Sequence, residues 1–106
     1  MTARDERRAA LASRLDALEQ VTAALAHATR RQILMTVHFW GGQMTAGEIA
    51  ARFDHAWPTI TRHLGVLVRA GLLGCEKVGR TRVYAVRKER LEVLRDWLDW
   101  FEPKKG

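Results

Sequence analysis

Apolar side chains recur at alternating four- and three-residue steps through the first quarter of the chain. The positions are Leu11, Leu15, Leu18, Thr22 and Leu25, and Thr22 is the one polar break among them. This spacing follows one face of a helix, and the segment is rich in alanine and free of glycine and proline. The pattern predicts a helix over about residues 5–26 with a narrow apolar seam of the kind that packs along another helix.

A second helical pattern begins near residue 29 and ends at a pair of glycines. Thr29 and Gln32 have the spacing of a capping box, which predicts Thr29 as the N-cap. Gly41 and Gly42 then stop the helix, because glycine accepts the backbone conformation that ends one. One face of this helix is apolar: Ile33, Leu34, Val37 and Trp40.

Two further helices are predicted over about residues 45–70, where they form a helix-turn-helix. Thr45 and Glu48 make a second capping box that begins the first of them. Residues 54–56 form a three-residue break, and Pro58 suits the first turn of the second helix, where its missing N–H costs nothing. The residue that caps this helix stays open, since Asp54 lies early and alanine at position 56 caps poorly.

The last third of the chain combines a β-hairpin with a final helix. Two runs rich in β-branched residues flank Gly79 and Arg80, which predicts a hairpin over about residues 72–86 with a type II′ turn. Helical spacing returns over about residues 88–101. The expected order is α-α-α-α-β-β-α, a mainly helical chain with a small hairpin. This order describes a single winged helix-turn-helix domain over residues 1–106.

The charge distribution and the composition indicate the kind of partner and the compartment of the protein. Nine basic and three acidic side chains lie within residues 52–90, an excess equal to the whole net charge of +6. Such a directed excess favours double-stranded DNA as a partner. The single cysteine suits a reducing cytoplasm. No apolar run reaches the roughly 20 residues of a membrane helix and no secretory signal is visible, so we expect a cytoplasmic protein without membrane contact.

The second helix of the pair carries a basic face opposite its apolar stripe. On a helical wheel Arg62 and Arg69 lie away from the apolar residues, and Gly65 between them would let another surface approach. We expect Arg62 to read a base edge, whereas Arg69 is equally well explained as a solvated residue. Trp57 is compatible with core packing or with DNA contact. His63 could donate to a phosphate, but packing is the favoured interpretation.

The tip of the hairpin is also basic. Lys77, Arg80 and Arg82 surround the turn, where they could reach the DNA backbone or the minor groove. Charges at this position also protect an edge strand from pairing with other chains, and both roles can hold together. Cys75 is expected to be a small buried residue rather than a redox sensor, because nothing nearby in the sequence would lower the pKa of its thiol.

Three segments, residues 25–34, 59–72 and 79–84, carry motifs in a specific order. They read LAHATRRQIL, TITRHLGVLVRAGL and GRTRVY. Together they resemble the signatures of the ArsR/SmtB family of bacterial winged helix-turn-helix regulators, over about residues 15–101. The resemblance implies a homodimer that binds operator DNA and is released by an effector, with groove contacts at Trp57, Pro58, Thr61 and Arg62. Trp57 and Pro58 depart from the polar residues usual in the family, so the operator sequence does not transfer.

Metal sensing is the best-known activity of the family that the chain resembles, and the residues here do not fit it. The thiol pair of the third helix would fall at Thr45 and Gly47, neither of which binds a soft metal. The last helix carries carboxylates but no histidine, and the four histidines of the chain have no short ligand spacing. We therefore expect no metal site and no cofactor.

The first and last helices are expected to form a constitutive homodimer. Trp97 and Trp100 widen the apolar stripe of the last helix beyond what one small core covers. The alternative is that both tryptophans close the core of the monomer. The expected interface residues come from both helices: Leu11, Leu15, Leu18, Leu91, Leu94, Trp97, Leu98, Trp100 and Phe101.

These patterns predict a sequence-specific transcriptional regulator, a repressor that binds a palindromic operator as a homodimer and does not respond to metal. A protein-docking module is the alternative, since winged helices also serve that purpose. No nucleophile–base pair or glycine-rich phosphate loop indicates an enzyme. The operator and any effector stay unknown. The DNA-binding candidates are Thr45, Trp57, Pro58, Thr59, Thr61, Arg62, His63, Arg69, Lys77, Arg80 and Arg82.

Overall fold

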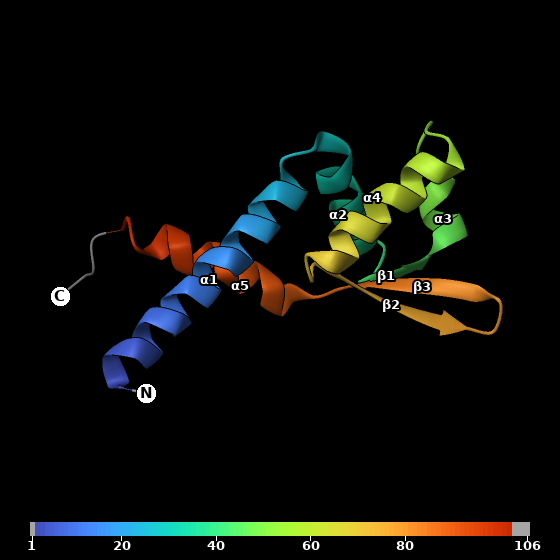
Figure 1. Cartoon of the computed structure of the whole chain (residues 1–106). Helices are drawn as coiled ribbons and strands as arrows, with labels where there is room; N and C mark the ends of the chain where they lie inside the picture. Colours follow the sequence, from blue (N-terminus) through green and yellow to red (C-terminus); the bar gives the residue numbers. More distant parts are fainter. Residues whose placement is uncertain (1, 103–106) are drawn as a thin grey trace.

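The computed structural model describes residues 2–102 and contains five helices and three strands within them. Their order along the chain is shown in Figure 1. The bounds are α1 Ala3–Leu25, α2 Ala28–Phe39, β1 Gln43–Thr45, α3 Ala46–Ala50, α4 Trp57–Arg69, β2 Leu73–Val78, β3 Thr81–Val86 and α5 Lys88–Asp99. The predicted winged helix-turn-helix is confirmed, and its helices begin and end within two residues of most expected bounds.

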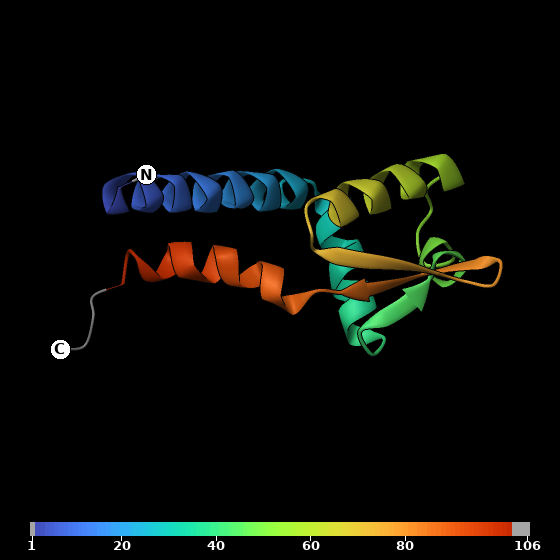
Figure 2. The ribbon, with the colours of Figure 1, turned by 60° about the horizontal axis from the view of Figure 1, so that its bottom comes forward.

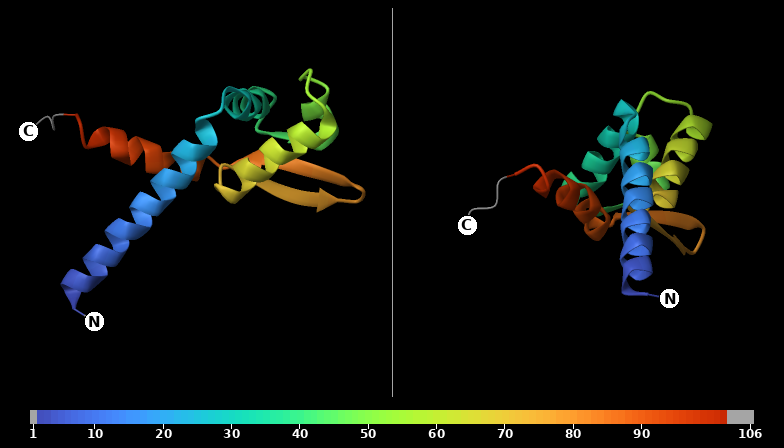
Figure 3. Two further views of the ribbon diagram at one scale, coloured as in Figure 1. Left: turned by 45° about the horizontal axis from the view of Figure 1, so that its top comes forward. Right: turned by 60° about the vertical axis from the view of Figure 1, so that its left-hand side comes forward.

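The molecule consists of a compact body and an extended arm. Helices α2, α3 and α4 pack with the sheet to form the body, while α1 and α5 lie side by side and extend away from it (Figures 1 and 2). The two helices of the arm cross and then diverge toward the chain ends, as both views of Figure 3 show. None of the helices within residues 2–102 is long and apolar enough to cross a membrane.

The hydrophobic core lies inside the body, and α5 contributes no buried residue to it. Ile60, Leu64 and Leu67 form the buried stripe of α4, as the sequence predicts. Each such side chain contributes roughly 1.5–3 kcal/mol by leaving water. Helix α1 reaches the core only near its C-terminal end, through Val21 and Ala24. The arm is therefore attached to the body at one end and uncovered along most of its length.

The sheet has three antiparallel strands in the order β1-β3-β2. The predicted hairpin is confirmed: Val78 pairs with Thr81 across a two-residue turn in which Gly79 has a φ of +63°. A positive φ at the first turn residue only is the pattern of a type II′ turn. Strand β1, which pairs with residues 83–85 of β3, was not predicted, and the expected order α-α-α-α-β-β-α is wrong in lacking it. Three residues are too few to show a strand periodicity of their own.

The helix caps correct two further expectations. The N-cap of α2 is His27, whose ring nitrogen accepts the Thr29 N–H at 3.3 Å, so Thr29 is not the cap. The turn between α3 and α4 covers residues 51–56 and is longer than the three residues expected. Ala56 is the N-cap of α4 without a side-chain hydrogen bond, and Pro58 lies in the first turn as predicted. The capping box between Thr45 and Glu48 is confirmed.

Candidate nucleic-acid interface

Helix α4 separates its buried and exposed residues as a groove-binding helix requires. Arg62 is exposed on the side opposite the buried stripe, and Thr61 is exposed at its flank. The Thr61 hydroxyl donates to the Trp57 carbonyl at 3.0 Å, which holds this side chain close to its own helix. The single ion pair among residues 2–102 joins Arg95 and Glu92 on α5. No carboxylate in the described part of the chain therefore neutralises Arg62.

Arg69 differs from Arg62 because it folds back along its own helix. A Cβ added at Gly65 would lie 3.2 Å from Nη1 of Arg69. The space beside Gly65 therefore holds this guanidinium. The expectation that Gly65 leaves room for another surface is wrong for this structure, because the glycine makes room for Arg69.

The surroundings of Trp57 and His63 on α4 distinguish core packing from exposure at these two positions. Trp57 is 53% exposed at the start of the helix, so it does not pack in the core. His63 is 8% exposed and packs against His27, with ring centroids 4.6 Å apart. Its Nδ1 lies 3.5 Å from Nη1 of Arg30. His63 is therefore a packing residue, and its inclusion among the DNA-binding candidates is wrong because the side chain is buried.

A small histidine cluster holds α4 against the start of α2. His55, from the turn before α4, lies 3.3 Å from the Thr29 hydroxyl through its Nε2. Burial lowers the pKa of His63, and the neighbouring His27 and Arg30 lower this pKa further. His63 is thus held in its neutral form, in which Nδ1 can accept the hydrogen bond from Arg30.

The wing, which comprises β2, β3 and their turn, places its cations in a pair that sequence reasoning missed. Lys77 and Arg82 are directly opposite in the strand register, and both are exposed together with Arg80. Like charges at opposed positions repel each other, so an anion between them would stabilise the hairpin. The hairpin register was the signal that could have revealed the pair. Cys75 is exposed rather than buried, because β2 leaves the core after its first two residues.

The exposed basic residues of α4 and of the wing come from neighbouring parts of the fold. The start of α4 and the tip of the wing lie at the same end, on the right in Figures 1 and 2, and the ends of α1 and α5 lie opposite. Thr45 is half-buried, and its hydroxyl accepts the Glu48 N–H at 3.1 Å as the cap of α3. The hydrogen bond that the Thr45 N–H donates to the Glu48 carboxylate at 3.0 Å, with the Thr45 hydroxyl nearby, holds the pKa of this carboxyl below its usual value.

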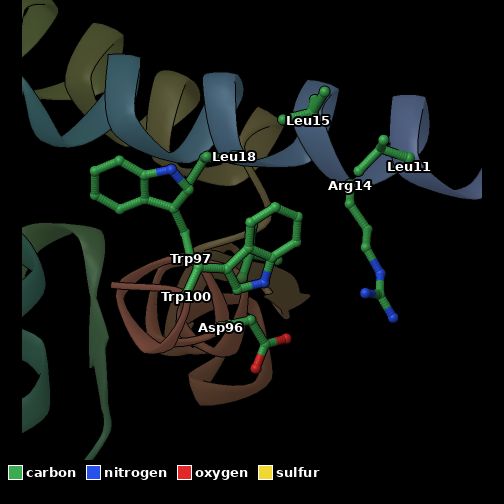
Figure 4. A pocket seen from close by; sticks show the side chains of 8 residues that line it. Leu11, Arg14, Leu15, Leu18, Asp96, Trp97 and Trp100 are labelled. Atoms are coloured by element: carbon green, nitrogen blue, oxygen red, sulfur yellow. The ribbon is translucent and has the colours of Figure 1, made fainter. Parts of the chain in front are cut away.

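The opposite end of the molecule has an uncovered apolar groove between α1 and α5. The groove has a volume of about 260 Å³, and Trp97 and Trp100 lie beneath the Leu15–Leu18 part of α1 in Figure 4. Trp97 is 41% exposed and Trp100 69% exposed, so they do not close the monomer core. Among the other expected interface residues, Leu11, Leu15, Leu98 and Phe101 are exposed, whereas Leu18, Leu91 and Leu94 are half-buried.

The arrangement of the histidine, cysteine and acidic side chains bears on metal binding. Within residues 2–102, no three histidine, cysteine or acidic residues are grouped so as to hold a metal ion. Thr45 and Gly47, where a thiol pair would be needed, lie at the start of α3. The absence of a metal response stays a prediction.

Comparison with known proteins identifies the family. Residues 25–75 match a family described as a helix-turn-helix domain. The transcriptional repressor SdpR of Bacillus subtilis (strain 168) is 34% identical over 83 residues, which cover 78% of this chain and 87% of that protein. A crystal structure of an ArsR family transcriptional regulator is 31% identical with a TM-score of 0.74, over 84% of this chain and 95% of that one. The chain belongs to the ArsR family.

ArsR-family membership makes the chain a DNA-binding transcriptional regulator and not an enzyme. The fold of the chain is also similar to that of a homodimeric winged helix-turn-helix domain from Mycobacterium bovis. That structure has a TM-score of 0.71 at 24% identity, and the match covers 100% of this chain and 96% of the other. At this identity the likeness shows a shared fold.

Proposed function

We propose that this ArsR-family regulator is a repressor that binds a palindromic operator as a homodimer and does not respond to metal ions. The observation that carries the proposal is the separation of the exposed cations on α4 and the wing from the exposed aromatic residues on α5. The relative from Bacillus subtilis is named a transcriptional repressor, and the Mycobacterium bovis domain is described as homodimeric. Both descriptions support the same arrangement for this chain.

At the end with the start of α4 and the wing, α4 is the recognition helix and the wing holds the DNA backbone. Arg62 lacks a carboxylate partner within residues 2–102 and is exposed near the start of α4, where it can reach the edge of a base. Lys77, Arg80 and Arg82 bind phosphates, which carry no sequence information. The other proposed contacts are Thr45, Trp57, Pro58, Thr59, Thr61 and Arg69.

At the opposite end, a second copy of the chain covers the groove between α1 and α5. Leu15, Trp97 and Trp100 are all at least 41% exposed, and soluble monomers avoid a contiguous apolar patch of this kind. Tryptophan is also among the residues that contribute most to interface free energy. A two-fold axis through this face would place two α4 helices roughly 34–36 Å apart, one turn of DNA, and so favours a palindromic site.

The independence from metal rests on the donor atoms. Thr45 and Gly47 supply neither a thiolate nor an imidazole, and α5 has carboxylates without a histidine. Cadmium and arsenite prefer thiolates, and transition metals such as zinc are also suited to imidazole. Calorimetry with zinc or cadmium at about 10 µM protein should show no stoichiometric binding.

Selection of DNA fragments by the purified protein tests the main proposal. We expect enrichment of one sequence with two inverted half-sites and, by sedimentation, two chains on each DNA duplex. A single bound chain on a single half-site would overturn the homodimer. The absence of any enriched sequence would overturn sequence-specific binding.

The exposure of Trp57 supports a second candidate function, a docking module for another protein. A large aromatic residue that is 53% exposed at the start of α4 could anchor a protein interface as well as a DNA groove. The exposed Arg62 on the same helix favours DNA. A docking module would bind no duplex in the selection experiment.

A further inference from the structure

Arg90, in the first turn of α5, joins three helices. Its Nε donates to the Ala70 carbonyl at 2.8 Å, and Ala70 is the C-cap of α4. Its Nη2 donates to Oε1 of Gln20 on α1 at 3.1 Å. One guanidinium therefore connects the recognition helix to both helices of the arm.

The end of α4 is shaped to receive this side chain. Gly71 has a φ of +80°, and a Cβ at this position would lie 3.0 Å from Nε of Arg90. The last carbonyls of a helix lack partners within the helix and carry partial negative charge, so a cation there is stabilising. Gly71 thus ends α4 and also leaves the space that Arg90 crosses.

Few other bonds connect α4 to the arm. Among residues 2–102, Arg90 is the one side chain of α5 that hydrogen-bonds to α4. Arg30 provides a separate link, because it donates to the carbonyls of Ala23 and Ala24 and approaches His63 in the middle of α4. Side-chain hydrogen bonds therefore join α4 to the arm at two points, in addition to the core packing of α1 and the Arg87 N–H bond to the Leu72 carbonyl, and Arg90 is the one on α5.

We propose that Arg90 is a positioning residue that sets the direction of α4 relative to the dimer helices, and with it the half-site spacing that the protein accepts. The inference rests on the proposed homodimer. In such a dimer the separation of the two recognition helices depends on how each α4 is attached to α1 and α5. Loss of the bond to the Ala70 carbonyl would loosen this attachment and leave the base-reading side chains intact.

The test measures affinity against operators whose half-sites are moved apart or together by one or two base pairs. The proteins are wild type, Arg90→Ala, Arg90→Lys and the control Arg95→Ala. The control removes the same charge from an exposed position of the same helix. We expect wild type and Arg95→Ala to prefer one spacing sharply. Arg90→Ala should lose about tenfold in affinity at that spacing, within the range of single coupling residues, and should tolerate the neighbouring spacings.

Arg90→Lys keeps the charge but has a single donor group, which cannot span the Ala70 carbonyl and Gln20 as the guanidinium does. It should flatten the spacing profile in part, and it provides the readout if Arg90→Ala folds poorly. A uniform loss of affinity at every spacing, with the wild-type profile retained, would overturn the positioning role. If wild type itself prefers no spacing, the proposed dimer on a palindrome fails instead, which separates the two conclusions.

Discussion

Arg62 and His63 are adjacent in the sequence and have opposite surroundings in the structure. A helix turns by about 100° per residue, so the exposed face of α4 passes to the buried face within one step. Arg62 is exposed to solvent, whereas His63 lies against His27 and Arg30. Single substitutions at the two positions should therefore affect different properties, DNA binding for one and stability for the other.

Arg62→Ala and Arg80→Ala should weaken DNA binding in different ways. Arg62→Ala removes a proposed base contact and should cost about 1–3 kcal/mol at the preferred base, with relaxed selectivity there. Arg80→Ala removes a phosphate contact and should weaken binding to all sequences alike. Affinities for a set of operators with single base changes distinguish the two patterns. Arg95→Ala, on α5, is the charge-matched control. If Arg62→Ala loses affinity with its selectivity intact, Arg62 does not read a base.

The buried His63 should make the stability of the protein depend on pH. Its pKa in the folded chain lies below the ordinary value of 6.5 because burial disfavours the charged ring. The unfolded chain therefore binds the proton more readily, so the stabilisation is complete above pH 6.5 and decreases as the pH falls below it. The slope cannot exceed about 1.4 kcal/mol per pH unit for one proton.

Urea unfolding between pH 5 and 8 measures this dependence. His63→Leu should flatten the decrease below pH 6.5, even if it changes the overall stability. His38→Gln removes an exposed histidine of α2 and should leave the decrease as it is in wild type. An unchanged slope in His63→Leu would assign the pH dependence to other groups.

His27 and Cys75 show why capping and exposure were only partly predictable from the sequence. The exposed Arg62 and the buried Leu64 follow directly from helical periodicity. His27 caps α2 only because its ring nitrogen faces the Thr29 N–H, a geometry that no spacing rule for serine or threonine contains. Cys75 is exposed because the wing extends past the core, and strand propensity does not reveal where a strand leaves it.

At the scale of elements, α1 and α5 depend on each other and on whatever covers them. Helix α5 has 12 residues and none of them is buried. Isolated helices of this length are marginal in water, so packing of an apolar face supplies most of their stability. Trp97 and Phe101 contact each other edge to face with ring centroids 5.1 Å apart, which orders the aromatic face before any partner arrives.

Combined replacement of Trp97 and Trp100 by alanine should lower both dimer content and DNA affinity. Truncation of a central aromatic residue commonly costs about 2 kcal/mol or more at an interface. Sedimentation at micromolar concentration measures the dimer directly. Trp40→Ala is the matched control, because Trp40 is 50% exposed but lies at the end of α2 against Arg52. A double variant that stays dimeric would place the interface on α1 alone.

Strand β1 shows which element-level features escape a local pattern. All five helices and the hairpin carry their own periodicity or turn residues, so the sequence predicts them. Strand β1 exists because Gln43 meets Ala85, forty-odd residues later, once the body has folded. Pairing at that separation depends on the tertiary structure and leaves no periodic trace in three residues. The homodimer, which the sequence also predicts, stays a prediction.

At the scale of the whole molecule, which measures 49 × 34 × 21 Å, the start of α4 and the wing lie at one end and the uncovered groove between α1 and α5 lies at the other. This separation lets one surface bind DNA while the other binds a second chain, without competition between them. The exposed cations of α4 and the wing (Arg62, Lys77, Arg80 and Arg82) also contribute positive potential where DNA would approach, which raises the rate of encounter at low salt.

DNA affinity should therefore decrease steeply with salt. A dimer that makes about 6–10 phosphate contacts loses roughly 10³–10⁵ in affinity between 50 and 200 mM salt, because bound counterions are released. Fluorescence anisotropy with labelled duplex at several salt concentrations gives the slope. Arg80→Ala should reduce the slope by about one per lost contact. Binding that ignores ionic strength would favour the docking module.

The placement of the four tryptophans gives the protein built-in optical probes. Indole emission shifts toward the blue when water is removed, and all four indoles are between 41% and 69% exposed. Trp97 and Trp100 lie at the end assigned to the second chain, Trp57 at the end assigned to DNA, and Trp40 on neither surface. Dilution and DNA titration would therefore alter the emission of different indoles, so association of the chains and binding of DNA can be followed separately in the unlabelled protein.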